Sequence, residues 1–252
     1  MSITGTVAVE DRRRLLVDLL RSRGSIGLDS AAETLDVSPM TVRRDLDYLE
    51  KEGIARRVRG GAIYIDIEDF QQRQGRELAA KRRIAEKLMP LVPTRSAISM
   101  DASTTIFQFA RMIESASELA IVTNGLTTFQ AVKGRSGVRA YLTGGESEER
   151  NESLVGSLAV TAVSGFVFAR SFMSTTCVDP DIGTSEPTTI EVEVKRAMAD
   201  ASKHVVLAAD SSKLGTQSVV RALAISRIHV LATELDPHDG RLDPYRDLVE
   251  LL

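Results

Sequence analysis

The chain has 252 residues, of which 43% are hydrophobic and 27% are charged, and its formal net charge is −3. This length allows a small module plus a larger body with its own core, and the ordinary composition argues against long disordered segments. A slightly acidic total is untypical of a nucleic-acid binder, but a local basic patch can still bind DNA, because phosphate attraction acts over roughly 10 Å in physiological salt.

The location follows from what the chain lacks. A single cysteine, Cys177, cannot form an intramolecular disulfide, and no Cys/His cluster has zinc-ligand spacing, so neither a metal nor a cofactor is predicted. The start, MSITGTVAVEDRRR, lacks the apolar core of a signal peptide, and no later run approaches the roughly 20 apolar residues of a membrane span. We expect a cytoplasmic protein with no membrane contact.

The first 65 residues predict a helix-turn-helix with a wing. Apolar residues at helical spacing indicate helices over 10–23, 28–35 and 38–51, with a tight turn before the third. Ser38 suits the N-cap of that third helix, because its hydroxyl can accept a bond from a free amide. Two extended runs around Gly60-Gly61 predict the hairpin wing.

The third helix is the candidate for contact with DNA. Val42, Leu46 and Leu49 recur at helical spacing, which leaves the N-terminal turn with Arg43 and Arg44 facing outward. Residues 1–65 carry 11 basic and 10 acidic side chains, so binding must depend on how the charges are placed. An arginine pair alone is usually solvated surface, but its place after the turn and before a basic hairpin favours DNA contact.

The stretch SPMTVRRDLDYLEKEGIARRVRGGA resembles the DNA-binding segment of the DeoR family of bacterial regulators of sugar metabolism. The resemblance implies that DNA is recognised by Thr41, Arg43 and Arg44, with Arg57 and Arg59 in the wing. Together with the cap and the exposed methionine, the predicted DNA-binding residues are Ser38, Met40, Thr41, Arg43, Arg44, Arg57 and Arg59.

Beyond a predicted linker over 66–80, residues 81–252 predict an α/β domain. Short apolar runs alternate with helical ones, which is typical of a parallel sheet covered by helices. The predicted strands are 97–100, 119–123, 138–142, 166–173, 204–209 and 228–232. One helical run covers 76–91, and further helices are expected to begin near Ser103, Leu126, Ser153, Glu186 and Ser218.

Polar residues follow these strands at the edge where ligands of such sheets lie. The first strand ends in DASTT and runs into a helix, whose free amides and dipole favour an anion such as phosphate. Asn124 and Asp210 can hydrogen-bond hydroxyls at the ends of other strands, and Lys213 supplies a cation. Ser103 alone could merely cap a helix, but the strand ends together argue for a small polyhydroxylated phosphate ester.

The likeness to the DeoR family extends to this domain. DASTT, TNG, TGG, VDPDIG, VKRAM and AADSSKLG are similar to the family's effector domain, whose fold resembles ribose-5-phosphate isomerase. The resemblance implies a domain that binds a phosphorylated sugar and then releases DNA. The effector-binding residues that it implies are Asp101, Ser103, Thr104, Thr105, Asn124, Gly144, Asp179 and Lys213.

The resulting prediction is a repressor of a carbohydrate operon, not an enzyme, that binds operator DNA as a homo-oligomer, either dimer or tetramer. One alternative is a sugar-phosphate isomerase with an added DNA-binding domain, in which Asp101, Asp179 and Lys213 would supply the base and the enediolate stabiliser. Against it, the isomerase-like cluster of Gly, Ala, Asp and Glu is missing from residues 177–180. A second alternative, an architectural DNA binder without a ligand, leaves the converging polar strand ends unexplained.

Overall fold

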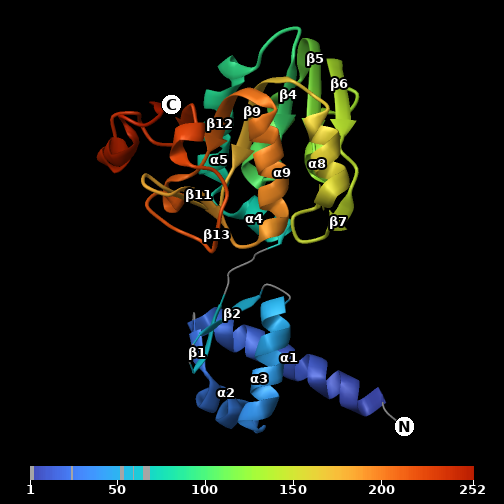
Figure 1. The fold of residues 1–252 in the computed structure, drawn as a ribbon, viewed down its shortest axis with the longest axis vertical. Coiled ribbons are helices and arrows are strands. Elements are labelled where there is room, and N and C mark those ends of the chain that lie inside the picture. Colours follow the sequence, from blue (N-terminus) through green and yellow to red (C-terminus); the bar gives the residue numbers. More distant parts are fainter. Residues whose placement is uncertain (1–2, 24, 52–53, 59, 65–68) are drawn as a thin grey trace. The chain divides into compact units, whose positions relative to one another are not determined.

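The chain forms two compact units, Met1–Ile67 and Glu68–Leu252 (Figure 1). The computed structural model describes residues 3–23, 25–51, 54–58, 60–64 and 69–252. Within these ranges, no helix is both long enough and apolar enough to cross a membrane.

The first unit confirms the predicted helix-turn-helix with a wing. Its helices are α1 (Ile3–Arg23), α2 (Leu28–Leu35) and α3 (Pro39–Lys51). Its described strands pair antiparallel in the order β1-β3-β2 and are β1 (Ser25–Gly27), β2 (Ala55–Val58) and β3 (Gly61–Tyr64). The predicted stripe of Val42, Leu46 and Leu49 is buried against Leu16 and Leu20 of α1. Strand β1 was not predicted, because three residues are too few to show an alternating pattern.

A buried carboxylate ties α1 to α3. Asp45 is 2% exposed and accepts hydrogen bonds from Arg12 Nε at 2.6 Å and Arg13 Nε at 3.0 Å. The guanidinium of Arg13 also lies 3.7 Å from the ring centroid of Tyr48. Because a buried charge is tolerated only when it is paired, these two arginines serve the fold of the module and not its basic surface.

The second unit confirms the predicted α/β class. In the described part of the chain, its main sheet has seven parallel strands in the order β15-β14-β12-β9-β4-β5-β6. They are β4 (Ala97–Met100), β5 (Ser115–Thr123), β6 (Ser136–Leu142), β9 (Phe168–Ser174), β12 (Ser202–Ala208), β14 (Val230–Ala232) and β15 (Glu250–Leu251). All six predicted strands are present, and the short β15 was missed.

Helices cover both faces of this sheet. Along β12, Val205 and Leu207 pack in the core with α8 (Gly156–Ser164) and α9 (Thr189–Asp200). The alternate residues Val206 and Ala208 pack in a second core formed with three other helices. These are α5 (Leu78–Leu88), α6 (Thr104–Met112) and α7 (Leu126–Val132). The strand order reverses between β9 and β4, which is the point where open parallel sheets bind ligands.

Three predicted helix starts differ from the structure. Ser153 belongs to β8 (Ser153–Val155), which pairs with β7 (Glu146–Glu148), so α8 begins later. Glu186 ends β11 (Gly183–Glu186), so α9 begins only at Thr189. The helix predicted near Ser218 was wrong, because strand β13 (Val220–Arg221) follows and pairs with β11, which also pairs with β10 (Cys177–Asp179).

Part of the predicted linker over 66–80 is helical and packs on the second unit. Helix α4 (Phe70–Gly75) begins at a capping box in which Asp69 and Gln72 bond each other's backbone amides. Phe70 is 1% exposed and meets the ring of Phe107 edge-on, and its amide donates to the carbonyl of Arg150 at 2.6 Å. Phe70 is the one large apolar residue of α4, so hydrophobic periodicity does not predict a packed helix here.

Candidate functional site

Helix α3 presents a polar N-terminal turn. The amide of Thr41 donates to Ser38 Oγ at 3.2 Å, so Ser38 caps the helix as predicted, and the two hydroxyls lie 2.9 Å apart. Met40 is 55% exposed, and the side chains of Arg43 and Arg44 are exposed as well. The first two turns of α3 therefore expose two arginines and a flexible apolar side chain to solvent.

The two described arginines of the wing differ, because Arg57 is half-buried and paired whereas Arg56 is exposed. The amide of Arg57 donates to Glu50 at 2.7 Å, and its half-buried guanidinium lies 3.7 Å from Asp47. The neighbouring Arg56, which was not among the predicted DNA-binding residues, is exposed. Strand alternation in β2 could have indicated this difference. Arg59 lies outside the described residues.

In the second unit, Asp101 lies where the strand order of the main sheet reverses, between β4 and β9. It follows β4 and is 1% exposed. Its Oδ1 accepts from the amide of Ser103 at 3.0 Å and from the Ser103 hydroxyl at 2.6 Å. Its Oδ2 accepts from the amide of Ser174 at 3.0 Å and lies 3.1 Å from Lys195 Nζ. One carboxylate thus holds the ends of β4 and β9 together.

Lys195 of α9 is fully paired inside this cluster. Its Nζ donates to the carbonyl of Ser174 at 2.6 Å and to Glu186 at 2.9 Å. Burial disfavours the ammonium, but the carboxylates of Glu186 and Asp101 outweigh burial and raise the pKa of Lys195. Lys195 therefore stays charged and acts mainly as the hub of the carboxylates around it.

Lys213 approaches the same serine from the end of β12 and is less well neutralised. Its Nζ donates to Ser174 Oγ at 3.2 Å, and its nearest carboxylate, Asp210, is 3.6 Å away. Burial lowers the pKa of Lys213; the charge of Asp210 opposes this shift, while the charges of Lys195 and Arg73 add to it. In the part of the chain that the structure describes, Lys213 is thus a cation with donors to spare at the point where the strand order reverses.

The N-terminus of α6 is connected to this cluster, because its N-cap residue Ser103 donates to Asp101. Ser103 caps the helix by accepting from the amide of Ile106 at 3.2 Å. Thr104 and Thr105 are buried in the first turn, where helix amides lack intrahelical partners. Within the described residues, Thr105 Oγ1 and Asn124 Oδ1 are buried without a hydrogen-bond partner, although Asn124 Nδ2 donates to Leu154 at 3.2 Å. Buried polar atoms of this kind call for a bonding partner.

Two predicted effector residues, Gly144 and Asp179, are not bonded directly to this cluster in the described residues. Gly144 follows β6, is exposed and has a φ of +72°. Asp179 accepts from Gln217 at 2.9 Å and from the amides of Asp181 at 2.9 Å and Ile182 at 3.0 Å, and these bonds lower its pKa. In the part of the chain that the structure describes, no hydrogen bond joins either residue directly to Asp101 or Lys213.

Sequence reasoning missed several members of the cluster, because they come from segments far apart in the chain. The missed residues are Arg73, Ser174, Glu186, Glu191 and Lys195. Glu191 accepts from Ser153 at 2.5 Å and from Asn151 at 3.2 Å. A usable signal was the spacing of Glu191 and Lys195, because acid and base four residues apart share one face of a helix.

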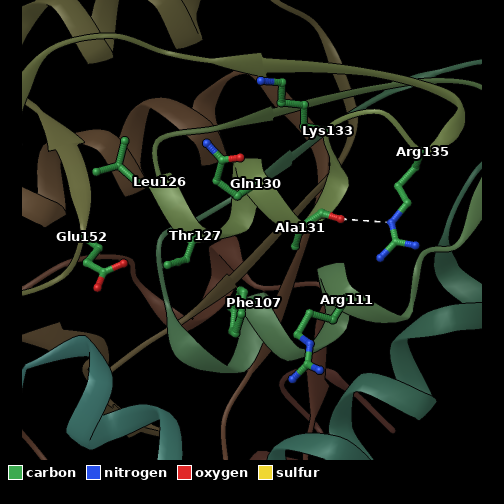
Figure 2. A pocket seen from close by; sticks show the side chains of 9 residues that line it. All are labelled: Phe107, Arg111, Leu126, Thr127, Gln130, Ala131, Lys133, Arg135 and Glu152. Atoms are coloured by element: carbon green, nitrogen blue, oxygen red, sulfur yellow. Dashed lines mark hydrogen bonds between the residues drawn. The ribbon is translucent and has the colours of Figure 1, made fainter.

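A separate depression lies on α6 and α7 (Figure 2). It has a volume of about 570 Å³ and is lined by Phe107, Arg111, Leu126, Thr127, Gln130, Ala131, Lys133, Arg135 and Glu152. The guanidinium of Arg135 turns back to the carbonyl of Ala131 at 3.1 Å. None of the predicted effector-binding residues lines this depression.

Models of known protein families match both units of the chain. Residues 12–68 match the model of the DeoR-like helix-turn-helix domain, and residues 76–235 match that of the DeoR C terminal sensor domain. The chain is 27% identical over 238 residues to a putative aga operon transcriptional repressor of Escherichia coli O157:H7, covering 92% of this chain and 87% of the relative. It is 29% identical over 229 residues to the glycerol-3-phosphate regulon repressor of Escherichia coli K12, covering 90% and 91%.

Among solved structures, ribose 5 phosphate isomerase A from Neisseria gonorrhoeae is similar with a TM-score of 0.37 and 21% identity. That match covers 56% of this chain and spans about half, 53%, of the isomerase. The two family models, in contrast, together account for most of the chain. The chain therefore belongs to the DeoR family of transcriptional regulators.

Proposed function

We propose that this regulator represses a carbohydrate-utilisation operon and that a phosphorylated sugar releases it from its operator. The observation that carries the proposal is the meeting of Lys195 and Lys213 at Ser174, where the strand order reverses. The names of the two relatives above, both repressors and one of a glycerol-3-phosphate regulon, support the same direction of control.

The chemistry of the site suits a phosphate group. Among the described residues, Lys213 has one hydrogen-bond acceptor, Ser174 Oγ, for its three N–H donors, and the positive end of the α6 dipole also favours an anion. The buried oxygens of Asn124 and Thr105 have no partner in the described residues and would accept hydrogen bonds from sugar hydroxyls. The site thus combines groups that favour an anion with acceptors that favour a polyol.

The same contacts speak against isomerase chemistry. A general base needs a carboxylate oxygen that is free to take a proton from the substrate. Asp101 is engaged by Ser103, Ser174 and Lys195. Asp179 is engaged by Gln217 and two backbone amides. We therefore propose that the site binds its ligand without turning it over, and that a steady rate with any pentose or hexose phosphate would overturn this view.

A thermal-shift screen tests the ligand class. A ligand that binds only the folded chain stabilises it by RT ln(1 + [L]/Kd), which is about 2.7 kcal/mol at a hundredfold excess over Kd. Pentose or hexose phosphates should raise the Tm of the full-length chain, and the unphosphorylated sugars should not. Equal shifts with both sets, or none with either, would contradict a phosphorylated effector.

A further inference from the structure

Helix α4 places an arginine beside the predicted effector site. Strand β3 of the DNA-binding unit ends at Tyr64, and α4, the first helix of the second unit, begins at Phe70. The guanidinium of Arg73 in α4 donates from Nη2 to Asn151 Oδ1 at 2.5 Å. Asn151 in turn donates to Glu191, so Arg73 is bonded into the carboxylate cluster through one amide side chain.

The charge of Arg73 acts on the same site. Burial lowers the pKa of Arg73, and the carboxylates of Glu191, Glu186 and Asp101 oppose that shift. The positive charge of Arg73 also disfavours the ammonium of Lys213. The hydrogen bonds give the same connection, because Asn151 links Arg73 to Glu191, which stands one helical turn before Lys195 in α9. Lys195 and Lys213 both donate to Ser174.

Arg73 and Lys213 are less completely paired than Lys195. Lys195 lies within 3.1 Å of two carboxylates, Asp101 and Glu186. Lys213 has its carboxylate at 3.6 Å, and Arg73 has an Nε that is buried without a hydrogen-bond partner in the described residues. Each of these two cations keeps a donor without a hydrogen-bond partner in the described residues, and a bound anionic group would satisfy both.

We propose that Arg73 binds the phosphoryl group of the effector together with Lys213, and that this contact transmits effector binding to α4. The inference rests on the proposed function and adds the residue through which effector binding would reach α4. Arg73 would exchange its bond to the neutral Asn151 for a charge-assisted bond to phosphate. Because α4 is also fixed by Phe70 on Phe107 and by Gln71 on Glu152 at 2.9 Å, a pull on Arg73 strains the helix that begins the second unit.

Direct binding of inorganic phosphate to the full-length chain tests the first half of this proposal. Arg73→Gln should weaken phosphate binding by at least about tenfold in calorimetric titration, which corresponds to about 1.4 kcal/mol. Arg73→Lys keeps the charge and should bind with intermediate affinity. The matched control is Arg83→Gln, an exposed arginine of α5, which should bind like wild type.

Hydrogen exchange of the wild-type chain tests the second half without any substitution. Added phosphate should change the exchange of amides in 69–76 as well as in 101–106. A change confined to 101–106 would overturn the role of α4. A variant Arg73→Gln that binds phosphate like wild type, while Lys213→Ala does not, would overturn this inference and leave the proposed function standing.

Failure of the proposed function has a different signature. If the wild-type chain binds neither inorganic phosphate nor any sugar phosphate of the thermal-shift panel, both proposals fall together. If it binds phosphate but Lys213→Ala and Arg73→Gln bind equally well, the anion site lies elsewhere and both assignments are wrong.

Discussion

Among single residues, the two lysines that donate to Ser174 differ in how completely carboxylates neutralise them. Lys195 is held by Asp101 and Glu186 and keeps its charge, which makes it a structural hub. Lys213 is poorly neutralised, and burial lowers its pKa. A site that binds an anion needs such an incompletely paired cation, because a fully paired one has no attraction left to offer.

Glu191 gives this cluster a dependence on pH. Burial raises the pKa of Glu191, against the hydrogen bond from Ser153 and the charge of Lys195. The folded chain therefore holds this proton more tightly than the unfolded chain does. The stability that it contributes is complete below the unfolded pKa, about 4.3, and is lost as the pH rises through the higher folded pKa.

We therefore expect Glu191→Gln to gain stability relative to wild type as the pH rises above about 4.3. Glutamine keeps a neutral acceptor for Ser153 and Asn151 and cannot ionise. The measurement is the Tm of both chains across a pH series. A difference that stays constant with pH would contradict the raised pKa.

On the DNA-binding surface, Arg44→Ala should weaken binding to a selected duplex by roughly 1 to 3 kcal/mol if the guanidinium contacts a base edge. The duplex would be enriched from a random pool by the wild-type chain, and affinity would be measured by gel shift. Arg83→Ala in the second unit serves as the control. Unchanged affinity of Arg44→Ala would remove Arg44 from the interface.

Single residues also show where sequence reasoning reached its limit. Asp101, Ser103 and Lys213 could be predicted, because each directly follows or lies near the end of a recognisable strand. Arg73 could not, since nothing in a polar segment reveals that Asn151 and Glu191 will lie beside it. The pairing of Lys195 with Asp101 joins α9 to the residue that follows β4, far away in the chain, which no local pattern encodes.

Among the elements, strands of the main sheet that carry runs of apolar residues were predictable, and the short strands outside that sheet were not. Runs such as Ala97–Met100 and Phe168–Ser174 lie in a sheet covered on both faces, so their apolar residues stand out. Strands β10, β11 and β13 have only three, four and two residues, too few to show an alternating pattern, and their pairing identifies them as strands. Because β11 extends to Glu186, α9 begins at Thr189 and not at Glu186.

Gly183 is the position on which this small sheet depends most. It begins β11 with a φ of +90°, and a Cβ there would lie 2.1 Å from the carbonyl oxygen of Leu223. We expect Gly183→Ala to cost more than about 2 kcal/mol of stability, measured by denaturant unfolding.

Gly165 provides the matched control for that substitution. It follows α8 in a helical conformation, and the nearest atom to an added Cβ is 3.4 Å away. Gly165→Ala should change stability by less than about 0.5 kcal/mol. Similar losses for the two variants would show that the left-handed turn at Gly183 is not the cause.

In the whole molecule, a small helix-turn-helix unit is followed by a larger unit that matches a sensor-domain model. Helix-turn-helix proteins present pairs of modules to half-sites about one helical turn apart or a multiple of it. If the regulator acts as a homo-oligomer, shifting the half-sites of a selected duplex by half a turn should weaken binding. Equal affinity for both spacings would indicate that single modules bind independently.

Effector control requires that the ligand bind two states of the chain with different affinity. The central claim is that occupancy of the site at Asp101 and Lys213 lowers the affinity of α3 for DNA. Two variants separate the halves of this claim. Lys213→Ala should bind DNA like wild type without responding to the ligand, and Arg44→Ala should keep the ligand-induced Tm shift while losing DNA affinity.

The most direct test is the affinity of the full-length chain for the selected duplex, titrated with the sugar phosphate that gives the largest Tm shift. We expect the Kd for DNA to rise at least about tenfold in wild type and to stay constant in Lys213→Ala. A wild-type affinity that the sugar phosphate leaves unchanged, or a normal response in Lys213→Ala, would contradict it.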